Sequence, residues 1–230
     1  MTRFAVLFDM DGTLVDSEPA HFEAMAEVLR LHGHAVPAAL AGMVTGMTGA
    51  DCHALLGELT GFKPSFEAYV RDKYGFYLAM ASGLAMRPGA QSVLDALQDG
   101  AIPWAIVSNS DRMLVDANLR AVGLQRPGLV SVSRNDVRDG KPAAEPYLRA
   151  AYLLGLAPSD CIVVEDSVPG AIAGLAAGMT VIGWPEPHRN DLVFPAGTIL
   201  ADPHDLLTTL SDCLAGLRRR FAKETLHVSR

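Results

Sequence analysis

The stretch LFDMDGTLVDS, residues 7–17, decides how the rest of the sequence is interpreted. The apolar letters FAVLF that lead into it predict a short strand, which ends directly at Asp9. Asp11 and Asp16 follow closely, with Gly12 between them. Neighbouring carboxylates repel one another, so a purely structural turn has little reason to hold three of them. A site that combines a carboxylate with a cation does have such a reason.

The bulk composition is that of an ordinary globular protein with a net negative charge. The chain has 230 residues, of which 50% are hydrophobic, and its formal net charge is −7. This length predicts one domain, or a domain with an insertion. The negative charge argues against nucleic acid or an anionic membrane as the main partner. An anionic substrate would therefore have to be bound by local positive charges.

Cysteine usage and hydropathy predict a cellular location. Cys52, Cys161 and Cys213 lie far apart without CxxC spacing, which predicts neither a disulfide framework nor a zinc site. The beginning of the sequence lacks the pattern of a signal peptide. No run of about 18 apolar residues occurs, so we expect no segment that spans a membrane. We therefore predict a cytoplasmic protein, and we expect a monomer or a weak homodimer.

The sequence changes character twice along its length. Between about residues 17 and 86, apolar residues recur at helical spacing, as in EPAHFEAMAEVLRLHG. After Pro88 and Gly89, short apolar strands alternate with helices, which is typical of βαβ units and a parallel sheet. The first strand must join that sheet across the helical block. We therefore predict an α/β fold, a Rossmann-like doubly wound parallel sheet core (1–16 and 87–230) with an inserted all-helical cap (17–86).

Reactive side chains stand at four places where the predicted sheet reaches its carboxyl edge. In open parallel sheets, ligands bind beyond the carboxyl ends of the strands. One such strand end would be unremarkable, because aspartate, serine and asparagine often cap helices or form turns. Four on one edge predict a site. They are Asp9 with Asp11, Ser108 with Asn109, Lys141 in the loop DVRDGKP, and Glu165 with Asp166.

Phosphoryl transfer to a carboxylate is the chemistry that fits these residues. Asp9 would attack phosphorus and form an aspartyl phosphate. Mg²⁺ held by Asp9 and Asp166 would neutralise charge where an anionic nucleophile meets an anionic phosphate. Asp11 would protonate the leaving alcohol and later deprotonate the water that hydrolyses the intermediate.

The remaining strand ends would bind the phosphate itself. Ser108, the backbone N–H of Asn109 and Lys141 would hold the transferring oxygens, where charge develops in the transition state. Gly12 would let the chain turn closely past the phosphate.

These motifs, in this order, resemble the haloacid dehalogenase superfamily. The motifs are DxDGT, a strand-terminal Ser-Asn, a loop Lys-Pro and a strand-terminal Glu-Asp. The helical insertion after the first motif, and the run VVEDSVPGAIAGLAAGM, are similar to the subgroup with β-phosphoglucomutase and small-metabolite phosphatases. The resemblance implies that Asp9 is the nucleophile and Asp11 the acid and base. It places Mg²⁺ on Asp9, on Asp166 and on the carbonyl of Asp11, with Glu165 as a supporting carboxylate behind these ligands.

The resemblance also implies that the cap closes over the site and selects the leaving group. Its candidate substrate contacts are His21, on the first cap helix, and three residues of a cap loop, Thr45, Gly46 and Thr48. β-Phosphoglucomutase-like sequences normally offer an arginine in this loop for a second phosphate, whereas Gly49 stands at the equivalent place here.

We therefore predict a Mg²⁺-dependent phosphatase, a phosphoric monoester hydrolase that acts on a small-molecule phosphorylated substrate, a sugar or sugar-acid phosphate. A phosphosugar mutase that uses the same aspartyl phosphate is the main alternative. A haloacid dehalogenase is disfavoured, because displacing halide from carbon requires no proton from Asp11. A regulatory binding protein with a relic site is disfavoured because all four motifs are retained.

Overall fold

The computed structural model describes residues 3–44 and 47–228. The chain forms two compact units. The first contains Met1–Val15, Met86–Val115 and Gln125–Arg230, and the second contains Asp16–Ala85 and Asp116–Leu124. We predicted a core of 1–16 and 87–230 with a cap of 17–86, and this domain assignment stays a prediction. No pattern in the sequence predicts that 116–124 belongs with the helical block.

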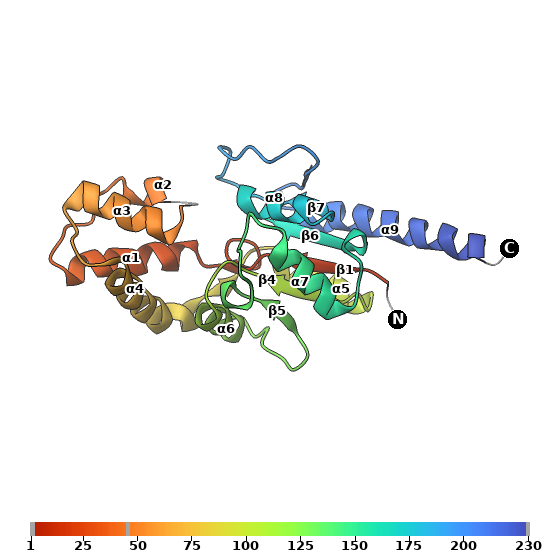
Figure 1. Ribbon diagram of the computed structural model, residues 1–230, viewed down its shortest axis with the longest axis horizontal. Coiled ribbons are helices and arrows are strands. Elements are labelled where there is room, and N and C mark those ends of the chain that lie inside the picture. The colour runs from red at the N-terminus through yellow and green to blue at the C-terminus, as the bar shows by residue number, and fades with distance from the viewer. Residues whose placement is uncertain (1–2, 45–46, 229–230) are drawn as a thin grey trace. The chain divides into compact units, whose positions relative to one another are not determined.

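A six-stranded parallel sheet forms the centre of the first unit, which confirms the predicted fold class (Figure 1). In spatial order its strands are β5 (Val130–Val132), β4 (Trp104–Val107), β1 (Ala5–Phe8), β6 (Cys161–Glu165), β7 (Thr180–Gly183) and β8 (Ile199–Leu200). All residues of the three central strands are buried. Apart from Glu165 at the end of β6, these strands are continuous apolar runs, because a parallel sheet is covered on both faces.

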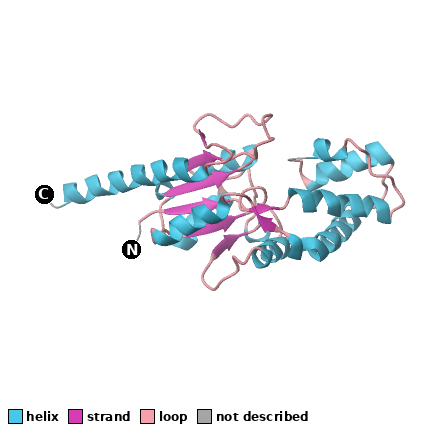
Figure 2. Ribbon diagram, turned by 180° about the vertical axis from the view of Figure 1, so that it is seen from behind, coloured by secondary structure: helices cyan, strands magenta, loops and turns pink. Residues whose placement is uncertain are grey.

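Helices of the first unit run alongside the sheet (Figure 2). They are α5 (Ala90–Asp99), α7 (Glu145–Leu154), α8 (Val168–Ala176) and α9 (Leu206–Val228). Helix α6 (Arg112–Ala121) begins in the first unit, and its residues from Asp116 onward belong to the second. One face of the sheet, with Leu7 and Val163, packs against Tyr147 of α7 and Ala171 of α8. On α8, a Cβ added at Gly174 would lie 2.8 Å from Val181, so the small residue permits close helix–sheet packing.

The second unit is helical. It contains α1 (Glu18–Leu31), α2 (Leu40–Val44), α3 (Gly49–Thr60), α4 (Phe66–Met80) and the 3₁₀ turn η1 (Ala81–Gly83). Thr48 and Ser65 cap the starts of α3 and α4 by accepting hydrogen bonds from backbone N–H groups. Met25, Leu56 and Tyr69 belong to its buried apolar cluster. The chain enters and leaves this unit through β2 (Val15–Asp16) and β3 (Ala85–Met86), which pair in a two-stranded sheet.

Among residues 3–44 and 47–228, the structure contains no helix with the length and apolar character needed to cross a membrane.

Candidate active site

The carboxyl ends of β1, β4 and β6 lie together at the centre of the sheet. Phe8, the last residue of β1, pairs with Ile106 of β4 on one side and with Val164 of β6 on the other. The backbone N–H of Asp9 donates a 3.0 Å hydrogen bond to the carbonyl of Val164. This register brings the residues that follow the three strands to one level. The prediction of a shared site assumed that these strand ends are adjacent, and the pairing of β1 with β4 and β6 makes them so.

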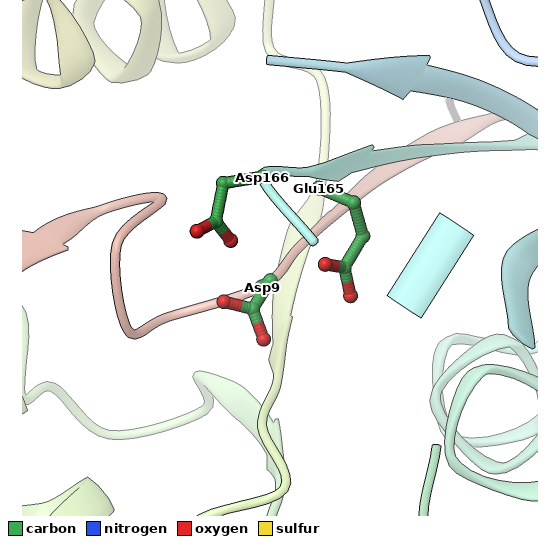
Figure 3. Close-up of side chains that lie close together, drawn as sticks. All are labelled: Asp9, Glu165 and Asp166. Carbon is green, nitrogen blue, oxygen red and sulfur yellow. The ribbon is translucent and has the colours of Figure 1, made fainter. Parts of the chain in front are cut away.

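Three carboxylates from two of these strand ends form a cluster. Asp9, Glu165 and Asp166 each offer an oxygen within 4.8 Å of the others (Figure 3). Burial raises the pKa of Asp9, and the negative charges of Glu165, Asp166 and Asp11 raise it further against the opposing charge of Lys141. Burial and the charge of Glu165 raise the pKa of Asp166 to about 7. A cation would stabilise the charged form of such a cluster.

The donor set fits a hard divalent cation on Asp9 and Asp166. Magnesium prefers carboxylate and carbonyl oxygens, and these two carboxylates come from adjacent strands. Asp166 is fixed by Thr13, whose Oγ1 donates to Oδ1 at 2.9 Å. The chain passes close to Asp166 at Gly12, which has a φ of +76°, and a Cβ there would lie 2.4 Å from Asp166 Oδ2. Only glycine fits this position.

Both oxygens of the Glu165 carboxylate accept hydrogen bonds from protein side chains. Its Oε1 accepts from Lys141 Nζ at 2.6 Å and from the hydroxyl of Tyr147 at 2.5 Å. Its Oε2 accepts from Ser167 Oγ at 2.8 Å. Gly170 lies directly against this carboxylate, since a Cβ added there would lie 1.8 Å from Oε1. The supporting role that the family resemblance implies for Glu165 stays a prediction.

Lys141 connects the nucleophile candidate to Glu165. The ammonium is buried and donates to Asp9 Oδ1 at 2.5 Å, to Glu165 Oε1 at 2.6 Å and to the carbonyl of Val107 at 2.7 Å. Burial disfavours its charge, but the two carboxylates outweigh burial and raise the pKa of Lys141 above its ordinary value. All three N–H bonds therefore have protein acceptors. A contact between Lys141 and a phosphate stays a prediction.

The loop after β4 supplies two further predicted residues. The side chain of Asn109 accepts a hydrogen bond from the backbone N–H of Lys141 at 2.8 Å and donates one to the carbonyl of Lys141 at 2.9 Å. Ser108 Oγ donates to Asp11 Oδ2 at 3.2 Å, and Ser110 Oγ donates to the same oxygen at 2.7 Å. The carboxylate of Asp11 is thus held by two serines. The structure therefore brings together all seven residues predicted for the core site.

Sequence reasoning gave no role in this site to several side chains that contact it. Thr13 and Ser167 are adjacent to recognised motifs, and Ser110 completes the letters SNS, so position alone could have suggested them. Tyr147 carried no such signal. It is fully buried in α7, where an aromatic residue at helical spacing indicates core packing.

The predicted cap contacts belong to the second unit. His21 stacks on Tyr77, with ring centroids 4.3 Å apart, and the Tyr77 hydroxyl donates to Asn118 Oδ1 at 2.9 Å. Thr48 is the N-cap of α3, and its hydroxyl donates to Asp51 at 2.7 Å. Thr45 and Gly46 lie outside the described residues. Substrate contacts by any of these four residues stay a prediction.

Comparison with known proteins assigns the family. Residues 5–178 match the family model of haloacid dehalogenase-like hydrolases. The chain is 37% identical to hexitol phosphatase A of Escherichia coli, over 76% of this chain and 80% of that one. It is 29% identical to a phosphorylated carbohydrates phosphatase of Thermotoga maritima, over 91% and 99% of the two chains. A solved β-phosphoglucomutase-like structure from Thermotoga maritima superposes with a TM-score of 0.75 at 28% identity, covering 91% of this chain and 99% of that one.

The chain belongs to the haloacid dehalogenase-like hydrolases, as its motifs predicted. Within that family it is a phosphoric monoester hydrolase.

Proposed function

We propose that the chain is a Mg²⁺-dependent phosphatase that hydrolyses a small phosphorylated metabolite through an aspartyl phosphate. The observation that carries this proposal is the buried contact of Lys141 Nζ with Asp9 Oδ1. A second carboxylate, that of Asp166, lies beside Asp9. Such an arrangement holds a carboxylate rigidly next to a place for a cation. The names of the relatives, a hexitol phosphatase and a phosphorylated carbohydrates phosphatase, support a sugar or sugar-acid phosphate as the substrate class.

Asp9 is the proposed nucleophile. Lys141 fixes Oδ1 of this carboxylate. An oxygen of Asp9 attacks phosphorus, a new O–P bond forms, and the bond from phosphorus to the ester oxygen breaks. The product of this half-reaction is an acyl phosphate on Asp9 together with the free alcohol.

Asp11 is the proposed acid and base. Its carboxyl group gives a proton to the leaving ester oxygen in the first half-reaction. In the second half-reaction it takes a proton from water, whose oxygen bonds to phosphorus while the bond from phosphorus to Asp9 breaks. Inorganic phosphate leaves and the carboxylate of Asp9 is restored. Ser108 and Ser110, which hold Asp11 Oδ2, keep this group at the carboxyl end of β4.

The charged oxygens of the phosphate need partners in both half-reactions. We assign them to Ser108, the backbone N–H of Asn109 and Lys141. Asp9, Asp166 and the carbonyl of Asp11 would hold Mg²⁺. When bound, the ion neutralises negative charge between nucleophile and phosphate.

A phosphosugar mutase is the second candidate, and the superposition with a β-phosphoglucomutase-like structure favours it. A mutase must grip the non-reacting phosphate of a bisphosphate while the intermediate turns over. No arginine or lysine lies between Arg30 and Lys63, and Gly49 stands where the mutase-like sequences normally carry arginine. Without such a cation, we expect water to hydrolyse the aspartyl phosphate faster than the phosphate is transferred back to a sugar. We therefore favour the phosphatase.

A two-part experiment tests this function. Purified protein with Mg²⁺ is screened against phosphorylated metabolites, with sugar, sugar-alcohol and sugar-acid phosphates as the expected hits. The protein is then incubated with β-glucose 1-phosphate and a trace of the bisphosphate, while glucose 6-phosphate and free phosphate are followed together. Free phosphate should dominate. If glucose 6-phosphate accumulates much faster, the mutase replaces the phosphatase.

We further propose a cytoplasmic monomer or weak homodimer. All three cysteines are free thiols, which is compatible with a reducing compartment. Light scattering across a range of protein concentrations tests the oligomeric state, and a stable larger assembly would contradict it.

A further inference from the structure

Arg87 is a buried arginine for which the reaction above has no role. It follows β3, and only 4% of the residue is exposed. Its guanidinium donates to three backbone carbonyls, those of Gly12 at 2.8 Å, Trp184 at 2.7 Å and Pro185 at 2.6 Å. Its own backbone N–H donates to the carbonyl of Leu14 at 3.0 Å. One side chain thus joins the loop after β1 to the loop after β7.

Both ends of this connection lead to the proposed metal ligands. On one side, Gly12 follows Asp11 directly. On the other side, the backbone N–H of Trp184 donates to the carbonyl of Glu165 at 2.6 Å, and Asp166 is the next residue.

The loop at Gly12 needs a contact that fixes it, because glycine allows more backbone conformations than any other residue. Gly12 has a φ of +76°. Its N–H donates to the carbonyl of Val15 at 2.9 Å, and its own carbonyl accepts from Arg87. The two peptide groups that flank Gly12 are therefore both fixed. The first of them contains the carbonyl of Asp11, which we assign to the metal.

The planar shape of the guanidinium allows Arg87 to make all of these contacts at once. Its carbon lies 3.6 Å from the centroid of the Trp184 ring. A planar fork can lie on an aromatic ring and still direct hydrogen bonds to several acceptors, whereas an ammonium is a point charge. Lysine would keep the charge and lose this combination.

We propose that Arg87 is a positioning residue of the active site, which holds the loop after Asp9 and the segment after Glu165 at the separation that the metal site requires. This inference rests on the proposed function. It assigns to Arg87 no contact with substrate. Groups that support metal ligands from behind typically contribute about 10- to 100-fold to metal affinity or activity.

Arg87→Lys is the test, with Arg220→Lys as the matched control. Arg220 also donates to a backbone carbonyl, that of Ser159 at 2.9 Å, and its guanidinium also stacks on an aromatic ring, that of Phe221. Arg220 is a residue of α9, and its partners Ser159 and Asp160 directly precede β6, at the end of that strand away from the site. Mg²⁺ binding is measured by calorimetry without substrate, and kcat and KM are measured with an aryl phosphate.

We expect Arg87→Lys to weaken Mg²⁺ binding and lower kcat by about 10-fold or more, with a smaller change in KM. Arg220→Lys should change none of the three. Arg87→Ala adds a rescue experiment, in which millimolar guanidinium, but not sodium, should restore part of kcat. Wild-type Mg²⁺ affinity and kcat in Arg87→Lys would overturn the inference, as would equal losses in both lysine variants. A wild-type protein that hydrolyses no phosphate ester would instead overturn the proposed function.

Discussion

The side-chain amide of Asn109 pairs with both backbone groups of Lys141. Nδ2 donates to the carbonyl at 2.9 Å, and Oδ1 accepts from the N–H at 2.8 Å. Gly140 makes room for this pair, since a Cβ added there would lie 2.7 Å from Asn109 Oδ1. The strand end after β4 therefore positions the lysine loop. Asn109 can serve the reaction through its side chain as well as through the backbone N–H that the sequence suggested.

Asn109→Asp should lower kcat by up to about 100-fold, because small displacements of a catalytic group are costly. The variant replaces a donating NH₂ with an oxygen that faces the carbonyl of Lys141. Asn135→Asp is the control, since the side-chain oxygen of Asn135 accepts a hydrogen bond from the backbone N–H of Arg112, and an aspartate oxygen can accept the same bond. Steady-state kinetics with an aryl phosphate check both variants. Equal kcat values in the two would show that the side-chain pair is dispensable.

Asp9→Asn should abolish hydrolysis of an aryl phosphate, because the amide cannot attack phosphorus. Loss of charge should also free Lys141 from one of its two carboxylate partners. Asp99→Asn, at an exposed helix end, makes the same chemical change and should keep full activity. Mass spectrometry of acid-quenched wild type should detect a phosphorylated peptide that contains Asp9. A phosphoryl group on any other residue would contradict the assignment of Asp9 as the nucleophile.

Asp11→Asn should affect alkyl esters more than aryl esters. An aryl leaving group barely needs a proton, whereas an alkoxide does, and acid catalysis typically contributes about 10²–10⁴-fold. The ratio of kcat/KM for the wild type and the variant is measured for one ester of each kind. Equal losses for the two esters would remove Asp11 from the role of acid.

Chelation should abolish activity and Mg²⁺ should restore it, while Ca²⁺ should inhibit because its coordination shell is larger and looser. Binding should also be visible without substrate. A ligand present at 100 times its Kd stabilises the native state by about 2.7 kcal/mol, so Mg²⁺ should raise Tm. Asp166→Asn should lose this shift. Full activity in excess chelator is the result that the mechanism does not allow.

Tyr147→Phe should destabilise the protein by about 1–3 kcal/mol, because it removes a buried donor from the charged Glu165. Tyr69 offers a matched comparison. It is equally buried, but its hydroxyl has no hydrogen-bond partner in the described structure. Tyr69→Phe should therefore be neutral or stabilising. Chemical denaturation of both variants measures the difference, and similar losses at the two sites would contradict this account.

The sequence was sufficient for the sheet and for the residues at its carboxyl edge. Continuous apolar strands define a covered parallel sheet, and motif residues such as Asp9 and Asp166 follow those strands directly. The contacts behind the site were not predictable. Tyr147 reaches Glu165, and Arg87 reaches Gly12, through tertiary packing between segments far apart in the chain. Neither residue differs, in sequence alone, from an ordinary core aromatic or a loop cation.

The position of β1 has a consequence for biosynthesis. Val6 pairs with Trp104 on one side and Ile162 on the other, so β1 is central to a sheet whose other strands are made much later. Sequence-distant pairings of this kind slow folding, and domains fold as units during synthesis. The helices of 16–85, which form one unit with 116–124, can assemble before β6, the second neighbour of β1, is made. A nascent chain shorter than β6 would thus carry a folded helical segment beside an exposed apolar strand, which makes it a substrate for chaperones.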